Sequence, residues 1–246
     1  MKRLPLIDLA TYSLLFLCFD CCSQNFTVGL RGGISIPNLT AAGTENPINS
    51  GYKSRLGSDL GIFGEYKVSE LLSVQAMAEY SEQGGKKNGL QAITNPQPPP
   101  QYLYGTFNSE AKLNYFMVPI LAKFGWNLKT SRFRIYVSGG PFVSFLLSAK
   151  QVTSGQSPLY LDPAGLQPIS PTQSFDGTQD IKSQLNSTNF GVEGNVGLMY
   201  RKGPNNFFIE GGGNYGLLNI QKGTENGKNN TGAATLVVGY SRAIQK

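Results

Sequence analysis

The sequence contains no histidine, and its only three cysteines, Cys18, Cys21 and Cys22, lie near the amino terminus. Histidine is the commonest general base and a frequent metal ligand, so hydrolases that depend on one are disfavoured. Without cysteine, residues 24–246 hold no disulfide, zinc–thiolate site or cysteine nucleophile. We therefore expect a protein that is not an enzyme, with no catalytic residues, metal site or cofactor.

Charge is also scarce, since 15% of the 246 residues are charged, although the formal net charge is +6. The lysines and arginines are spread along the chain and not clustered, which argues against a nucleic-acid partner. Anionic lipid headgroups are a better match for such a dispersed positive charge. Mean hydropathy is slightly negative, so helical membrane spans do not dominate the chain.

The amino-terminal segment has the layout of a secretory signal. Lys2 and Arg3 precede a mostly apolar stretch, residues 4–19, and small residues follow up to Ser23. This pattern predicts a signal peptide over residues 1–23 and a single β-barrel domain over residues 24–246. Two alternatives are an amino-terminal membrane helix, which Asp8 disfavours, and a lipid anchor at Cys22.

What the sequence has in abundance is alternation of apolar and polar residues. In residues 132–147, apolar side chains recur at every second position: Phe133, Ile135, Val137, Val143, Phe145 and Leu147. A period of two is that of a pleated strand. The run exceeds the 5–6 residues typical of a globular strand and reaches the 9–11 that a tilted membrane-spanning strand requires. This run therefore predicts a strand with an apolar solvent on one side.

Eight such segments predict strands, at residues 26–36, 57–67, 72–83, 109–124, 132–148, 189–201, 206–220 and 232–244. Long polar loops are expected at residues 37–56, 84–107, 151–187 and 221–231, and they alternate with short connections. Outer-membrane barrels combine short periplasmic turns with longer extracellular loops. We therefore predict an all-β, eight-stranded, antiparallel up-and-down transmembrane β-barrel, monomeric, embedded in outer-membrane lipid, with both termini periplasmic.

Several short motifs resemble a known family. They are Lys-Leu-Asn-Tyr at 112–115, Val-Pro-Ile-Leu-Ala-Lys at 118–123, Tyr-Val-Ser-Gly-Gly-Pro at 136–141, Gly-Leu-Arg-Gly-Gly at 29–33 and Tyr-Ser-Glu-Gln-Gly at 80–84. They are similar to the outer-membrane β-barrel family abundant in Bacteroidetes, often labelled PorT-like or porin-family proteins, with barrels of the OmpA/OmpX type. The resemblance implies a location in the bacterial outer membrane and leaves the biochemical role open.

Two further patterns concern small and aromatic residues. Residues 211–216 match the dinucleotide-binding pattern G-x-G-x-x-G, but that reading needs a helix to follow. Here the glycines fall within an alternating strand, so we interpret them as places where a strand bends. Aromatic girdles are expected to include Tyr80, Tyr115, Trp126 and Tyr200.

The polar face of the strands carries charges of both signs. We predict that seven of them point into the lumen: Arg31, Glu65, Glu79, Lys112, Arg134, Glu193 and Glu210. An eight-stranded barrel is narrow enough for side chains to fill it. An internal network of ion pairs and hydrogen bonds is therefore the favoured interpretation, and a narrow polar path or ligand cavity is the alternative.

Function beyond structure is expected in the long loops, because loops carry recognition on rigid scaffolds. The expected surface contacts, through which other envelope proteins would bind, are Lys86, Lys87, Tyr102, Tyr104 and Tyr160. The first hypothesis is thus a structural or surface-interaction barrel, as a small component of an envelope or secretion assembly. The others are a narrow porin-like channel for small solutes and a soluble lipocalin-like ligand-binding barrel.

Overall fold

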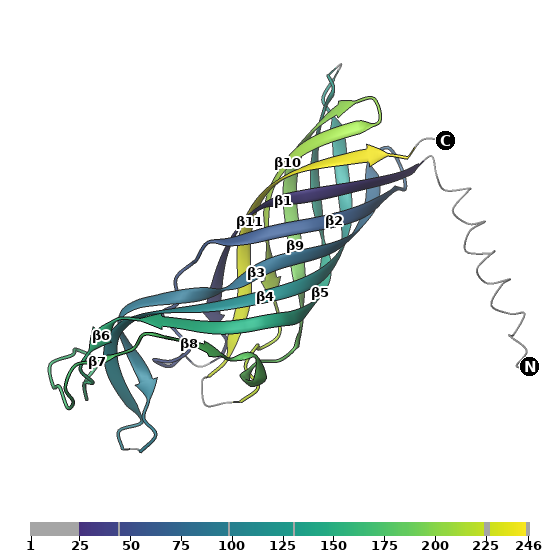
Figure 1. The fold of residues 1–246 in the computed structure, drawn as a ribbon. Helices are drawn as coiled ribbons and strands as arrows, with labels where there is room; N and C mark the ends of the chain where they lie inside the picture. Colours follow the sequence, from purple (N-terminus) through teal and green to yellow (C-terminus); the bar gives the residue numbers. More distant parts are fainter. Residues whose placement is uncertain (1–24, 44, 98, 130, 224–226, 245–246) are drawn as a thin grey trace, which may run out of the picture.

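Eight long strands dominate the computed structural model, which describes residues 25–43, 45–97, 99–129, 131–223 and 227–244 (Figure 1). The predicted signal peptide lies outside the described residues. The strands are β1 (Phe26–Ala41), β2 (Gly57–Lys67), β3 (Leu72–Thr94), β4 (Tyr102–Asn127), β5 (Phe133–Ser154), β9 (Thr188–Lys202), β10 (Asn205–Gly216) and β11 (Asn229–Ala243). All of the predicted strands are present.

The sheet closes on itself. Its order is β4-β3-β2-β1-β11-β10-β9-β5, and β4 also pairs with β5, so the eight strands form an antiparallel ring. Each strand of the ring is thus hydrogen-bonded on both sides, which is how a barrel removes its open edges. The predicted eight-stranded up-and-down barrel is confirmed. Separately, no helix in the described part of the chain is long and apolar enough to cross a membrane.

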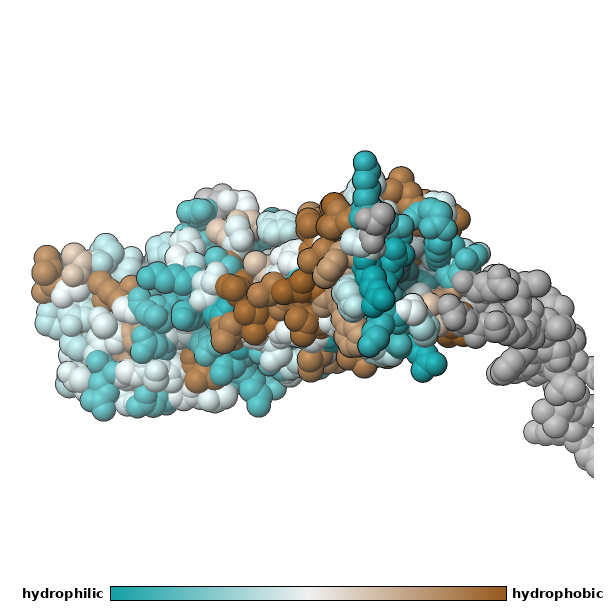
Figure 2. Space-filling model, turned by 90° about the horizontal axis from the view of Figure 1, so that it is seen from above, coloured by the Kyte–Doolittle hydropathy of each residue, from teal (hydrophilic) through white to brown (hydrophobic). Residues whose placement is uncertain are grey.

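Alternation places apolar side chains on the outside of the barrel. Leu30 and Ile62, neighbours on β1 and β2, are 57% and 65% exposed. Figure 2 shows hydrophobic surface gathered on the half of the molecule nearer the start of β1, while hydrophilic surface covers most of the opposite half. A soluble lipocalin-like barrel would turn these residues inward, so that alternative is wrong.

Aromatic side chains ring one end of this apolar belt. Phe133 and Tyr200 lie on adjacent strands with ring centroids 5.3 Å apart, and Phe207 and Tyr240 lie 5.4 Å apart. Trp126 is exposed on the same outer face of β4. For Tyr115 the predicted place in the girdle is wrong, because its side chain is 1% exposed and points into the lumen. The parity of β4 was ambiguous since both of its faces are apolar.

The two ends of the barrel differ. The short connections between β2 and β3, β4 and β5, and β9 and β10 lie at the end where β1 begins and β11 finishes. There the amide of Ile244 donates to the carbonyl of Phe26 at 2.8 Å. We call this the short-turn end. The long connections gather at the opposite, long-loop end.

Two predicted loops are wrong in part. Residues 84–107 were expected to be a loop, yet β3 and β4 pair continuously from Gly84↔Lys112 to Thr94↔Tyr102, and only the proline-rich tip is irregular. Residues 151–187 hold the end of β5, the short strands β6 (Gln156–Ser157), β7 (Gln173–Ser174) and β8 (Gly177–Asp180), and a 3-10 helix η2 (Lys182–Gln184). Beyond the apolar belt neither face of a strand needs apolar residues, so alternation fades while backbone pairing continues.

Two apolar clusters fill parts of the lumen. The one toward the long-loop end includes Leu113, Tyr115, Phe142 and Leu146. The other lies toward the short-turn end and contains Phe63, Met77, Leu121, Tyr136, Met199 and Phe208. Buried charged residues, Arg31 and Glu79 among them, lie between the two clusters.

Candidate functional site

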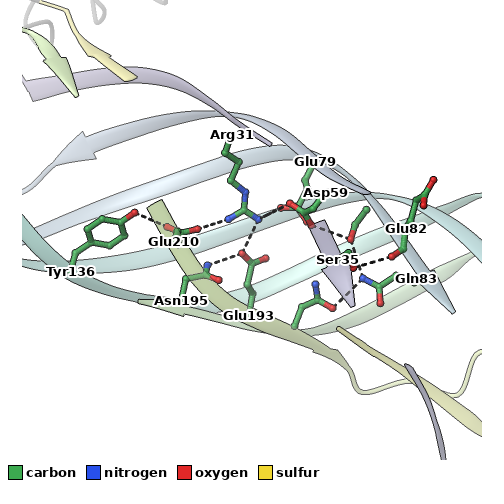
Figure 3. Close-up of polar contacts among 12 residues, drawn as sticks. Arg31, Ser35, Asp59, Glu79, Glu82, Gln83, Tyr136, Glu193, Asn195 and Glu210 are labelled. Atoms are coloured by element: carbon green, nitrogen blue, oxygen red, sulfur yellow. Dashed lines mark hydrogen bonds and ion pairs between the residues drawn. The ribbon is translucent and has the colours of Figure 1, made fainter. Parts of the chain in front are cut away.

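One arginine and four carboxylates meet in the middle of the lumen. Arg31 comes from β1, Asp59 from β2, Glu79 from β3, Glu193 from β9 and Glu210 from β10, each on the inward parity of its strand (Figure 3). We call these five residues the lumen network. All are buried, so the network connects five strands across the barrel in a place that water does not reach freely.

The guanidinium of Arg31 is the centre of the network. Its Nη1 lies 2.7 Å from Oε1 of Glu210, while its Nη2 lies 2.5 Å from Glu79 and 3.2 Å from Glu193. Asp59 is more distant, with Oδ1 3.5 Å from Nη2. A planar guanidinium presents five donors in fixed directions. It is therefore the side chain best able to hold several carboxylates at once.

Neutral donors stabilise the carboxylates from the outside of the network. The hydroxyl of Tyr136 donates to Glu210 at 2.9 Å, and the amide of Asn195 donates to Glu193 at 2.9 Å. Ser81 donates to Asp59 at 3.3 Å. Buried charge needs such partners because its desolvation is costly. These bonds help to offset the excess of carboxylates over the single guanidinium.

A second ion pair lies nearer the short-turn end. Nζ of Lys123 on β4 is 2.9 Å from Glu65 on β2, and it lies 4.1 Å from the centroid of the Tyr136 ring. Ser73 also donates to Glu65, at 2.6 Å. Tyr136 thus contacts both charge clusters and joins them into one layer of packed side chains.

The structure places most of the predicted lumen charges inside, though not all together. Arg31, Glu79, Glu193 and Glu210 converge, and Glu65 forms the separate pair with Lys123. Arg134 is half-buried at the short-turn end, where it donates to the carbonyl of Glu70 at 3.0 Å. For Lys112 the prediction is wrong, since its side chain is 44% exposed on the outer face, 3.5 Å from Glu110.

Sequence reasoning missed three lumen residues. Asp59 shares the parity of Glu65 on the same strand, so alternation alone contained the signal. For Lys123 and Tyr136 the signal in the sequence was weaker. Lys123 has the parity of the buried Leu113 and Leu121, and choosing Lys112 as the inward residue assigned β4 the opposite parity.

The lumen is closed by these side chains. Tyr115, Met117, Leu121, Tyr136, Glu79 and Asp59 are each at most 1% exposed. Cavities remain toward the two ends, one of about 210 Å³ at the long-loop end and one of about 90 Å³ at the short-turn end. The described residues hold no cluster of histidine, cysteine and carboxylate side chains suited to a metal ion.

The larger of these two cavities, which we call the vestibule, is built by strands of the ring together with the long connections. Its apolar walls include Leu39, Ile48, Leu113, Ile181, Leu185 and Ile220. Lys87 from β3 also lines it, with Nζ 2.6 Å from the carbonyl oxygen of Ile48 and 4.4 Å from the centroid of the Tyr52 ring. Burial lowers the pKa of Lys87 to about 8.

The five predicted surface contacts lie on the long-loop half of the molecule. Lys86 and Lys87 are adjacent on β3, but Lys87 points into the vestibule. Tyr102 and Tyr104 belong to the start of β4 and not to a loop. Tyr160 pairs with Tyr104 through two backbone hydrogen bonds of 2.8 and 2.9 Å. The tyrosines thus form part of an ordered extension of the barrel.

A closed, eight-stranded barrel with an apolar outer belt and a charged lumen is an integral membrane protein of the outer-membrane barrel class. The family model described as outer membrane protein beta-barrel domain matches residues 22–222. The chain belongs to this family, and it is a bacterial outer-membrane protein.

Several solved structures are similar to this chain. Neisserial surface protein A is 13% identical, with a TM-score of 0.42, covering 89% of this chain and 96% of its own. The attachment invasion locus protein Ail of Yersinia pestis is 13% identical, with a TM-score of 0.39, covering 88% and 99%. The N-terminal β-barrel domain of OprF from Pseudomonas aeruginosa is 14% identical, with a TM-score of 0.32, covering 89% and 98%. No curated protein matches the chain in sequence.

Proposed function

We propose that this protein is a non-catalytic outer-membrane barrel with a sealed lumen, which acts as a structural or surface-interaction protein through its long-loop end. The observation that carries the proposal is the lumen network, in which Arg31 binds four carboxylates from four other strands. Such a cross-lumen clamp blocks the path that a channel needs.

The long-loop end supports an interaction role. Here β3, β4 and β5 extend beyond the apolar belt, and β8 adds to β5. Loops and extensions on a rigid barrel are well placed for recognition. Other envelope proteins are the proposed partners, and the PorT-like motifs support a place in an envelope or secretion assembly. The barrel itself is proposed to be monomeric, since its ring of strands needs no second copy to close it.

The sealed lumen is tested by single-channel recording of the purified protein in planar bilayers. We expect no stable openings above background, because buried side chains from every strand fill the lumen. As an open control, Arg31→Ser combined with Tyr136→Ser removes the two largest side chains around Glu210 and should raise the conductance. Stable openings of the unaltered protein would overturn the sealed-lumen proposal in favour of a narrow channel.

The proposed orientation has the long-loop end outside the cell and both termini periplasmic. Residues 24–246 contain no cysteine, so once the proposed signal peptide is removed, an introduced cysteine is the single thiol. Leu166→Cys lies at the long-loop end, where the native side chain is 79% exposed, and Lys202→Cys lies at the short-turn end. A membrane-impermeant maleimide should label the first variant in intact cells and the second only after permeabilisation. The reverse pattern would refute this orientation.

A further inference from the structure

The vestibule has properties that sealing the lumen does not require. It lies between the long connections and the apolar cluster that includes Leu113, Ile181 and Leu185, which forms its floor. If the lumen served only as a plug, side chains would be expected to fill this space. Instead a cavity of about 210 Å³ remains, which is larger than the roughly 150 Å³ apolar cavity known to bind benzene.

The charge of the vestibule is one-sided. Of the lining residues that the structure describes, Lys87 is the only charged one, and none is an aspartate or glutamate. Among the described residues Lys87 forms no ion pair, and its polar contacts are the carbonyl oxygens of Pro47 and Ile48. An ammonium group in a partly buried place without a counter-ion is a favourable partner for an anion.

The remaining polar groups of the lining are uncharged. They include the side chains of Gln91, Gln151, Gln184 and Gln221. Amides can donate to or accept from a ligand without favouring either charge. Polar and apolar groups line the vestibule in about equal measure, which suits a small ligand with one polar end and an apolar body.

We propose that the vestibule binds a small apolar monocarboxylate about the size of benzoate, with its carboxylate on Lys87 and its apolar body against Leu113, Ile181 and Leu185. The closed lumen beneath makes this a dead-end binding site and not the entrance to a pathway. The site therefore holds a ligand at the long-loop end without passing it through the barrel.

Binding is measured by fluorine NMR of 4-fluorobenzoate added to the folded protein in detergent micelles, with protein-free micelles as the reference. We expect saturable line broadening at pH 7, and much weaker binding of the neutral isostere 4-fluorobenzamide. Lys87→Gln keeps a polar side chain that is one atom shorter and removes the charge, so it should weaken binding of the acid about tenfold. Ala111→Phe, which places a ring in the vestibule, should weaken binding of both compounds.

The matched control is Lys86→Gln. Lys86 immediately precedes Lys87 on β3 and faces away from the vestibule. This variant should therefore bind the acid within about twofold of the unaltered protein. Heat-modifiable gel mobility shows whether each variant is folded. The proposal is overturned if broadening does not exceed that of empty micelles, if acid and amide bind equally, or if Lys86→Gln and folded Lys87→Gln behave alike.

A pH series adds an independent readout. The carboxylate stays ionised between pH 7 and pH 9.5, whereas Lys87, with its pKa lowered to about 8, loses its proton. Tyr52, the only other titratable group among the described lining residues, has its pKa raised by burial and stays neutral. Two further lysines, Lys53 and Lys86, are β-bridge partners of each other close to Lys87, and neither lines the vestibule. Affinity for the acid should therefore fall as pH rises, and a flat profile would contradict the assignment of Lys87.

Discussion

At the scale of single residues, Arg31 is the side chain on which the lumen depends most. Four carboxylates approach its guanidinium, and all five side chains are at most 4% exposed. Removing one partner of a buried ion pair leaves uncompensated charge and costs about 3–5 kcal/mol. This cost is far larger than that of losing an exposed pair, which is about 0–1 kcal/mol.

We therefore expect Arg31→Gln to lower the free energy of unfolding by about 3–5 kcal/mol. The measurement is urea unfolding in micelles, followed by the fluorescence of Trp126, the single tryptophan. Lys112→Gln is the matched control, since Lys112 contacts Glu110 on the exposed outer face, and it should change stability by less than about 1 kcal/mol. Equal effects of the two substitutions would show that the network does not stabilise the barrel.

Gly197 makes a different kind of contact with the same region. A Cβ atom at this position would overlap the ring of Tyr136, whose hydroxyl donates to Glu210. Gly197→Ala should therefore cost about 1–3 kcal/mol through overpacking. Gly211→Ala is the control, because nothing lies within 4 Å of a Cβ built there. If both variants unfold at the urea concentration of the unaltered protein, the close approach of Gly197 to Tyr136 is wrong.

At the scale of elements, the β3–β4 hairpin extends beyond the apolar belt at the long-loop end. Thr94 and Tyr102 are its last paired residues, and residues 95–101 connect them. An Asn-Gly turn suits a two-residue hairpin between paired strands. The tip should therefore be dispensable for folding of the barrel.

Replacing residues 95–101 with Asn-Gly should leave the heat-modifiable gel mobility unchanged and shift the free energy of unfolding by no more than about 1 kcal/mol, because the loop-closure cost changes slowly with length. The same variant should retain the vestibule, whose lining on β3 ends at Thr94. Loss of folded protein would mean that the tip takes part in forming the barrel.

At the scale of the whole molecule, the apolar belt determines where the barrel resides. Its residues are apolar because they face lipid, and a charged residue near the bilayer midplane of a barrel costs about 2–4 kcal/mol. Ile62→Lys, in the middle of the belt on β2, should show this loss in the free energy of unfolding measured in lipid bilayers. Leu166→Lys, at the long-loop end outside the belt, should not. A tolerated lysine at position 62 would contradict the assigned membrane-facing surface.

Much of this architecture was predictable. Alternation located all eight ring strands, and the bounds of β2 agree with the predicted residues 57–67. The inward parity of Arg31, Glu79, Glu193 and Glu210 also followed, since each strand has an apolar face that must meet lipid. On β4 the same logic was ambiguous, because Leu113, Tyr115 and Leu121 make its inner face apolar as well. The prediction therefore chose Lys112 where Lys123 is the inward lysine.

The sequence by itself determined that the chain forms eight long antiparallel strands, each with one apolar face, because a period of two turns every second side chain to the same side. Only the tertiary structure decided that the apolar faces point outward and the charges inward, as the exposure of Leu30 and Ile62 shows. It also decided which of the charges meet, because ring order and strand stagger bring Arg31 to residues up to 179 positions away. The same closure made the vestibule, where four strands and three connections bring Lys87 together with an apolar floor.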